Sequence, residues 1–171
     1  EWYGAACEWL EAAGIAQYEI SNFARHGCAS RHNAKYWQRE PYVGFGLDAH
    51  SMLRTGEGAV RWANTSDLES YLTDGPDVFG LRAVAVPEVE VVGKEKAFEE
   101  TMFLGLRMNE GIDIEALRSE FGVGLTRDAV VALGDVEDAG LVERNGNFVR
   151  LTARGRMVSN EVFSRLLVAA V

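Results

Sequence analysis

The apolar residues at the start of the chain recur at helical spacing. They are Trp2, Ala5, Ala6, Trp9, Leu10 and Ala13. This spacing predicts a helix over residues 2–13, which Gly14 would end as a C-terminal cap. Apolar and polar residues then alternate in QYEISNF, residues 17–23, which predicts a strand. A helix, a short loop and a strand in this order form the repeating unit of an α/β sheet or barrel.

The middle of the chain shows shorter and less regular patterns. Residues 24–40 are polar and aromatic and predict a loop. Residues 42–45 predict a short strand that runs into a Gly-rich turn, and residues 55–58 (TGEG) predict a second turn. A short helix should follow in RWANTSDLESYL, with Thr65 or Ser66 as its N-cap.

After Pro87 the pattern becomes mainly helical. Phe98, Met102 and Leu106 recur every four residues, which predicts a long helix over residues 93–108. IDIEALRSEFG and TRDAVVALGDVEDAG predict two more helices, with N-caps at Asp113 and Thr126 respectively.

The last part of the chain predicts a hairpin followed by a helix. In LVERNGNFVRLT two β-prone runs flank Asn145-Gly146, a dipeptide that favours a type I′ turn. An amphipathic helix capped by Thr152 should close the chain. Helix, helix, hairpin and helix form a winged-helix-like order.

Composition and charge exclude several classes of protein. The net charge of −9 argues against non-specific binding to nucleic acid or to an anionic membrane surface. No apolar run approaches the roughly 20 residues that a membrane-spanning helix needs. Cys7 and Cys28 form neither a CxxC pair nor a disulfide framework, so we predict a cytoplasmic protein with reduced thiols.

One motif and the order of the last elements raise the possibility of a nucleotide or a DNA ligand. GFGLDA at residues 44–49 fits a loose dinucleotide-binding pattern, but the residues after it predict no helix to hold a pyrophosphate. We therefore expect Gly44 and Gly46 to allow a close backbone approach at a strand end, which leaves space for a ligand nearby. The winged-helix order could place a helix in a DNA groove, but the acidic chain argues against DNA, and this shape also occurs as a structural module.

The stretch HNAKYW, residues 32–37, carries the most informative polar residue. The three histidines, at positions 26, 32 and 50, match no zinc-binding spacing. Tyr36, Trp37 and Tyr42 could line a flat apolar pocket for a planar macrocycle, with His32 at its rim as a donor to a central metal. Alternatively, the aromatic rings pack between two subdomains and His32 only forms hydrogen bonds. No Ser-His-Asp or Cys-His catalytic arrangement is legible, so no catalytic residue is assigned.

Six ordered motifs resemble one family. They are YEISNFARHG, SRHNAKYW, PYVGFGLDAHS, RWAN with SYL, EETMFLGLRMNEGID and LTARGRMVSNEVF. Together they resemble the radical-SAM family of oxygen-independent coproporphyrinogen III oxidases and their relatives. Within it, the HNxxY motif at His32, Asn33 and Tyr36 resembles the haem-chaperone branch, which binds haem and hands it on.

The resemblance implies an α+β fold and the C-terminal part of a longer protein. Residues 1–58 would be the last elements of a partial α/β radical-SAM barrel, and residues 59–171 a mainly helical, winged-helix-like domain. The family's CxxxCxxC loop, which holds a 4Fe-4S cluster and positions S-adenosylmethionine, is absent here, and Cys7 and Cys28 do not replace it. This chain alone should therefore perform no radical chemistry.

The resemblance also implies ligands and partners. His32 would contact haem iron, Asn33 would brace its loop by side-chain hydrogen bonds to backbone, and Tyr36 would contact the macrocycle. The loop with Gly44, Gly46 and His50 would lie on the S-adenosylmethionine side. The partners would be haem or a porphyrin, the missing N-terminal barrel, a haem-acceptor protein and a further copy of the chain.

One departure from the family pattern and two other functions complete the expectations. Asp48 stands where the branch usually has glycine; its carboxylate could repel an anionic ligand or point to solvent. The first alternative function is a true oxidase, in which a 5′-deoxyadenosyl radical removes hydrogen from the propionates of coproporphyrinogen III. The second is a structural winged-helix interaction domain.

Overall fold

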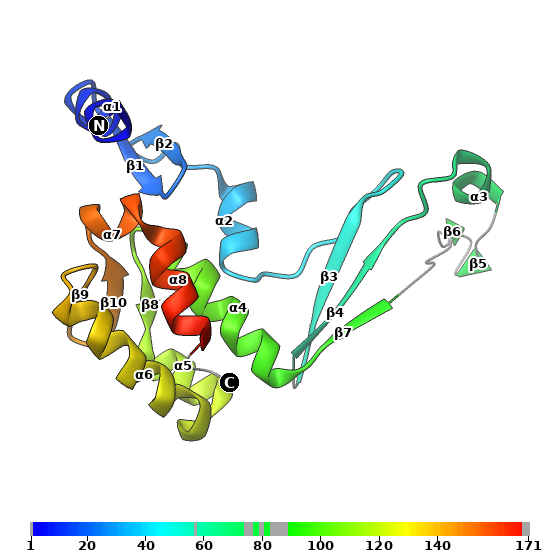
Figure 1. The fold of residues 1–171 in the computed structure, drawn as a ribbon. Helices are drawn as coiled ribbons and strands as arrows, with labels where there is room; N and C mark the ends of the chain where they lie inside the picture. Colours follow the sequence, from blue (N-terminus) through cyan, green and yellow to red (C-terminus); the bar gives the residue numbers. More distant parts are fainter. Residues whose placement is uncertain (1, 57, 74–76, 79–80, 83–88, 169–171) are drawn as a thin grey trace. The chain divides into compact units, whose positions relative to one another are not determined.

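The computed structural model describes residues 2–56, 58–73, 77–78, 81–82 and 89–168 (Figure 1). They fall into two compact units. The first unit comprises Glu1–Arg39 and Phe98–Val171, and the second comprises Glu40–Ala97. Helices and antiparallel sheets occur together, which confirms the α+β class. None of the described helices combines the length and the apolar character that crossing a membrane requires.

The first unit begins with a helix and a hairpin. Helix α1 (Trp2–Ala12) is confirmed, and Gly14 follows it with a φ of 75°. The single strand predicted over residues 17–23 is wrong, because the chain folds back into β1 (Ile15–Glu19) and β2 (Asn22–Arg25). The carboxylate of Glu19 causes the reversal: its Oε1 accepts hydrogen bonds from the Ser21 N–H at 2.8 Å and the Asn22 amide at 2.6 Å.

The loop predicted over residues 24–40 contains helix α2 (Arg31–Trp37). Ser30 is its N-cap, and the Ser30 Oγ accepts a hydrogen bond from the backbone N–H of Asn33 at 3.2 Å. The prediction failed because two helical turns are too short to show a hydrophobic period against polar neighbours.

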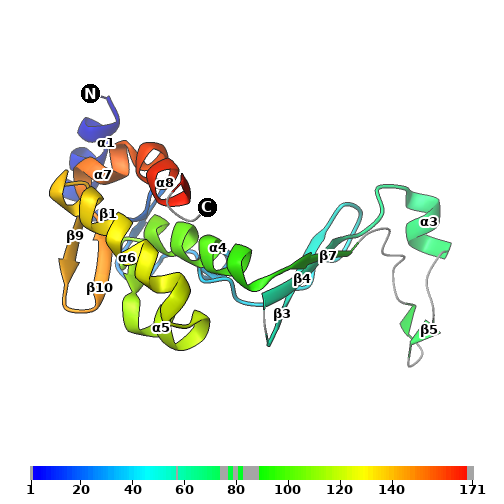
Figure 2. The ribbon, with the colours of Figure 1, turned by 60° about the horizontal axis from the view of Figure 1, so that its bottom comes forward.

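A bundle of longer helices completes the first unit. Helix α4 (Lys94–Arg107) is confirmed, and so is the Asp113 cap of α5 (Ile114–Phe121), whose Oδ1 accepts from the Glu115 N–H at 2.9 Å. Helix α4 lies beside α5 and α8 (Ser159–Val168) (Figure 2). The ring of Phe98 meets that of Phe121 on α5, and the ring of Phe103 meets that of Phe163 on α8.

The predicted start of α6 (Val123–Asp138) is wrong by one turn. The helix follows Gly122, which has a φ of 88°, and Thr126 lies inside it. The buried Thr126 hydroxyl donates a hydrogen bond to the Gly122 carbonyl at 2.8 Å, a bond within the helix rather than a cap.

The predicted hairpin is confirmed as β9 (Val142–Asn145) and β10 (Phe148–Leu151). With β8 (Ile112–Asp113) they form a three-stranded sheet in the order β8-β10-β9. The central turn residues are Gly146, with a φ of 60°, and Asn147, whose φ is not positive, so the turn has a type II′ pattern and not type I′.

The Thr152 cap is also confirmed, but the closing helix is divided in two. The Thr152 Oγ1 accepts from the Gly155 N–H at 3.0 Å at the start of α7 (Ala153–Met157). Val158 then interrupts the helix before α8 begins. Between these elements lie the most deeply buried apolar side chains of the unit: Leu106, Leu133, Val136, Val149, Leu151 and Val162.

The second unit contains a sheet with the order β3-β4-β7. Its strands are β3 (His50–Thr55), β4 (Gly58–Ala63) and β7 (Val89–Val92); α3 (Leu68–Thr73), β5 (Asp77–Val78) and β6 (Leu81–Arg82) complete the unit. Thr55 pairs with Gly58 across β3 and β4, as the turn predicted at residues 55–58 requires, and residue 57 of that turn lies outside the described residues. The strand predicted at 42–45 is only a single bridge between Tyr42 and Met52.

The cap of α3 is neither Thr65 nor Ser66. The side chain of Asp67 accepts a hydrogen bond from the Ser70 N–H at 2.7 Å, the usual N-cap contact. Because this backbone hydrogen bond stabilises the charged carboxylate, the pKa of Asp67 lies below its usual value.

A buried ion pair joins the first hairpin to the end of α4. Glu19 is 0% exposed, and its Oε2 lies 2.6 Å from Nε of Arg107. Backbone hydrogen bonds run alongside the pair, from Ile20 N–H to the Arg107 carbonyl at 3.2 Å and from Asn109 N–H to the Tyr18 carbonyl at 3.1 Å. The pair and these bonds hold together segments that lie far apart in the sequence.

Replacing Glu19 by Gln should destabilise the first unit by about 3 kcal/mol, because the largely buried Arg107 would lose its counter-charge. Urea unfolding measures this loss. The matched control is Glu143→Gln, which breaks an exposed pair with Arg150 at the same 2.6 Å distance and should cost less than about 1 kcal/mol. Equal losses in the two variants would show that burial of the Glu19 pair carries no special weight.

Candidate functional site

His32 and Tyr36 lie one turn apart on α2 and contact each other. The Tyr36 hydroxyl oxygen is 3.2 Å from His32 Nε2, and the two rings meet edge to face with centroids 5.0 Å apart. His32 is exposed and Tyr36 is half-buried. The helix therefore presents an imidazole to solvent with a phenol supporting it from one side.

Asn33 follows His32 in the first turn of α2. The segment that its side chain was expected to brace is helical, and the hydroxyl of Ser30 braces it through the backbone N–H of Asn33. Asn33 is half-buried. A role of its amide towards a ligand stays a prediction.

The C-terminal end of α2 is attached to α4 at two points. The guanidinium carbon of Arg107 lies 4.4 Å from the centre of the Trp37 ring. The buried Arg39, with a φ of 50°, places its Nε 3.2 Å from a Glu100 carboxylate oxygen and donates from Nη1 to the Thr101 hydroxyl at 3.0 Å. Sequence reasoning missed both arginines, because nothing local distinguishes them from surface arginines.

The loop with Gly44 and Gly46 lies in the second unit, and its backbone requires glycine at both positions. A Cβ at Gly44 would lie 2.4 Å from the carbonyl oxygen of His50, and Gly46 has a φ of 106°. The loop leads into strand β3 and not into a helix, so the context that a dinucleotide-binding turn needs is missing. The close backbone approach expected at these glycines is confirmed at Gly44, whereas a Cβ at Gly46 would meet nothing within 4 Å and only the positive φ favours glycine there.

Asp48 in the same loop has a φ of 54° and is exposed. Glycine adopts this conformation freely, and aspartate tolerates it better than most residues. The backbone at Asp48 is thus one that glycine would also adopt without strain, and the exposed side chain lies at the surface.

Three side chains hold this loop by hydrogen bonds to its backbone. The Asn64 amide donates to the carbonyls of Gly44 at 3.2 Å and Gly46 at 2.8 Å. The hydroxyls of Ser51 and Tyr71 accept hydrogen bonds from the N–H groups of the same two glycines, at 3.0 and 2.9 Å. They secure a loop whose Phe45 is 87% exposed, between the exposed Val43 and Leu47.

The predicted site residues are thus distributed over both units. His32, Asn33 and Tyr36 belong to the first unit, whereas Tyr42, Gly44, Gly46 and the exposed His50 belong to the second. Among the described residues no group of three histidine, cysteine or acidic side chains could hold a metal ion. Among the predicted site residues of the first unit, His32 is the histidine that could bind the metal of a planar ligand.

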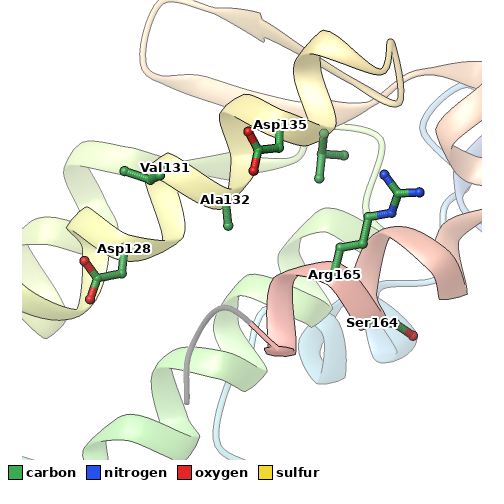
Figure 3. A pocket seen from close by; sticks show the side chains of 7 residues that line it. Asp128, Val131, Ala132, Asp135, Ser164 and Arg165 are labelled. Carbon is green, nitrogen blue, oxygen red and sulfur yellow. The ribbon is translucent and has the colours of Figure 1, made fainter.

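The first unit contains several cavities, among them one of about 310 Å³ that is lined by Glu110, Asn145, Phe148 and Arg150. A groove of about 640 Å³ lies between α6 and α8 and is lined by Asp128, Val131, Ala132, Asp135, Val136, Ser164 and Arg165 (Figure 3). It contains none of the predicted site residues. A smaller cavity of about 210 Å³ is lined in part by Trp37 and Gln38 at the end of α2, opposite residues of α4 and α5.

Comparison with known proteins gives a consistent set of matches. Residues 92–158 match the model of the HemN C-terminal domain. The chain is 35% identical to the haem chaperone HemW of Bacillus subtilis over 98% of this chain and 42% of that protein. It is 28% identical to the haem chaperone HemW of Lactococcus lactis over 93% of this chain and 39% of that protein.

A solved structure matches as well. Coproporphyrinogen III oxidase (HemN) from Escherichia coli, a radical SAM enzyme, superimposes with a TM-score of 0.67 at 16% identity. The match covers 96% of this chain and 39% of the enzyme. The chain thus spans about two fifths of the length of each of these three proteins.

Replacing Asn64 by Ala should loosen the Gly44–Gly46 loop, because two backbone carbonyls would lose their donor in a buried setting. We expect a loss of about 2 kcal/mol in the stability of the second unit and faster proteolysis next to Phe45. Urea unfolding and limited digestion measure the two effects. Asn160→Ala on α8, where the asparagine is exposed, is the control, and a loss as large there would contradict the assignment.

Proposed function

This chain belongs to the radical-SAM family of coproporphyrinogen III oxidases and haem chaperones, and from this premise we propose that it is the C-terminal part of a haem chaperone, which binds haem and transfers it. The observation that carries the proposal is the HNxxY segment, which presents an exposed histidine on a capped helix. The identity with the haem chaperone of Bacillus subtilis over nearly the whole chain supports it.

His32 is the residue that we propose binds haem iron. Its imidazole is exposed, and histidine is an established axial ligand of haem iron, as in globins and peroxidases. The Tyr36 hydroxyl contacts Nε2, so iron would either bind at Nδ1 or displace this hydroxyl from Nε2. Tyr36 would then contact the macrocycle, and Asn33 would face the same ligand from the first turn.

The loop of Gly44, Gly46 and His50 is proposed for the S-adenosylmethionine side of the whole protein. The backbone of Gly44 approaches that of His50 closely, and hydrogen bonds from side chains hold the loop. The loop therefore offers a fixed surface that a ligand could contact. The 4Fe-4S cluster would be held outside this chain, because the three closely spaced cysteines that it needs are absent from the sequence.

The domain division also stays a proposal. Residues 1–58 would end the radical-SAM barrel and residues 59–171 would form the C-terminal domain. Gly58 is the first residue of β4 in the β3-β4-β7 sheet, so such a boundary would not coincide with the two compact units.

The order of α5, α6, β9 and β10, with β8 joining their sheet, supports a winged-helix-like module. The partners we propose for it are the barrel of the same protein, a haem-acceptor protein and a second copy of the chain.

The alternative function is oxidative decarboxylation of coproporphyrinogen III. The similarity to the Escherichia coli enzyme favours it, but at 16% identity this similarity supports the fold alone. The full-length protein with its cluster decides between the two functions: we expect haem binding without turnover of coproporphyrinogen III. Decarboxylated product would establish the oxidase instead. A purely structural winged-helix domain would bind neither haem nor porphyrinogen.

Haemin titration followed by the Soret band should show saturable binding that His32→Ala weakens at least about tenfold, because an axial ligand is lost. The control is His26→Ala, which removes another exposed histidine of the same unit and should leave binding unchanged. Equal binding by wild type and His32→Ala would remove His32 as the iron ligand.

A further inference from the structure

We propose that Arg107 and Trp37 form a positioning pair for haem capture, which holds α2 and thereby places His32 and Tyr36. This inference rests on the proposed function and adds residues that lie outside the HNxxY motif. It begins from a network of contacts around the guanidinium of Arg107, all within the first unit.

The edges of the Arg107 guanidinium are bound on the hairpin side. Its Nε lies 2.6 Å from Oε2 of the buried Glu19, and its Nη2 donates a hydrogen bond to the Ser21 hydroxyl at 3.0 Å. An ion pair at one nitrogen and a hydrogen bond at another restrict the orientation of a planar group more than a single contact would. The flat face of the guanidinium thus has a defined direction.

That face lies over the indole ring of Trp37, with the guanidinium carbon 4.4 Å from the ring centre. A cation over an indole is attracted by the negative face of the ring, and more strongly where the charge is shielded from water. The Arg107 side chain is 21% exposed, so much of its charge is shielded. The indole Nε1 is buried and has no hydrogen-bond partner in the part of the chain that the structure describes. In the described part of the chain, the contact on the ring face is therefore what holds Trp37 in place.

Trp37 is the last residue of a helix of only seven residues. An isolated helix of two turns is unstable in water, so tertiary contacts must decide whether and where α2 forms. His32 and Tyr36 lie on this helix, and the second attachment, through Arg39 to Glu100 and Thr101, lies just beyond its end. Loss of the Trp37 contact should leave His32 able to bind iron but less often correctly placed.

The experiment compares Trp37→Leu with Trp37→Phe in the whole chain. Leucine keeps an apolar side chain but removes the ring, whereas phenylalanine keeps a face for Arg107. We expect Trp37→Leu to weaken haemin binding about tenfold and Trp37→Phe to stay within about threefold of wild type. At saturation the Soret maximum should match wild type, because His32 itself is unchanged.

A second measurement does not depend on haem. Hydrogen exchange of the α2 amides should accelerate about tenfold in Trp37→Leu and remain near wild type in Trp37→Phe. The control for general destabilisation is Val136→Ala in the core of α6, which should lower the urea midpoint but leave haemin binding and α2 exchange unchanged.

The outcomes separate the two proposals. If wild type binds haemin, His32→Ala does not and Trp37→Leu binds like wild type, the positioning role is wrong while the haem site stands. Unchanged α2 exchange in Trp37→Leu also overturns the positioning role. If wild type binds no haemin, the haem site and its positioning pair are both wrong, and accelerated exchange would then describe only the packing of α2.

Discussion

The buried pair of Glu19 and Arg107 is the constraint on which the first unit depends. A carboxylate with no exposure is costly unless it is paired and hydrogen-bonded, and Glu19 meets this requirement with Arg107 on one oxygen and Ser21 and Asn22 on the other. These partners come from the β1–β2 turn and from the end of α4. The two segments must therefore meet for the charge to be satisfied.

Helix α2 supplies no partner to Glu19, but it contacts the arginine that Glu19 binds. It follows β2 in the chain, and its last residue rests on the guanidinium that Glu19 orients. Since a seven-residue helix has little stability of its own, the position of the His32–Tyr36 pair follows from a charge pair that touches neither residue. The second unit achieves a similar result with neutral groups: Asn64 and two hydroxyls hold a loop that presents an exposed phenylalanine.

Sequence reasoning succeeded where a pattern is long or where its signal is local. Helix α4 shows its period over fourteen residues, and the caps at Asp113 and Thr152 are read from adjacent residues. It failed where an element is fixed by a residue far away in the sequence, or where the element is very short. The β1–β2 reversal depends on a carboxylate whose partner is on α4, and α2 is shorter than the window in which a period is visible. The prediction of Thr126 as a cap was wrong because Gly122, one turn earlier, already starts the helix.

The same division applies to the candidate site. The i, i+4 contact of His32 and Tyr36 follows from the sequence once α2 is known to be a helix, whereas no local pattern pairs Trp37 with Arg107. This division suits a protein that we propose transfers its ligand. Release of haem would break the bond between iron and the histidine whatever element carries the histidine. On a short helix held by tertiary contacts, an acceptor that competes for the surfaces holding the helix would lower the cost of that step, because the histidine would lose its placement. The weakness of α2 as an isolated helix is then what makes release to a partner physically accessible.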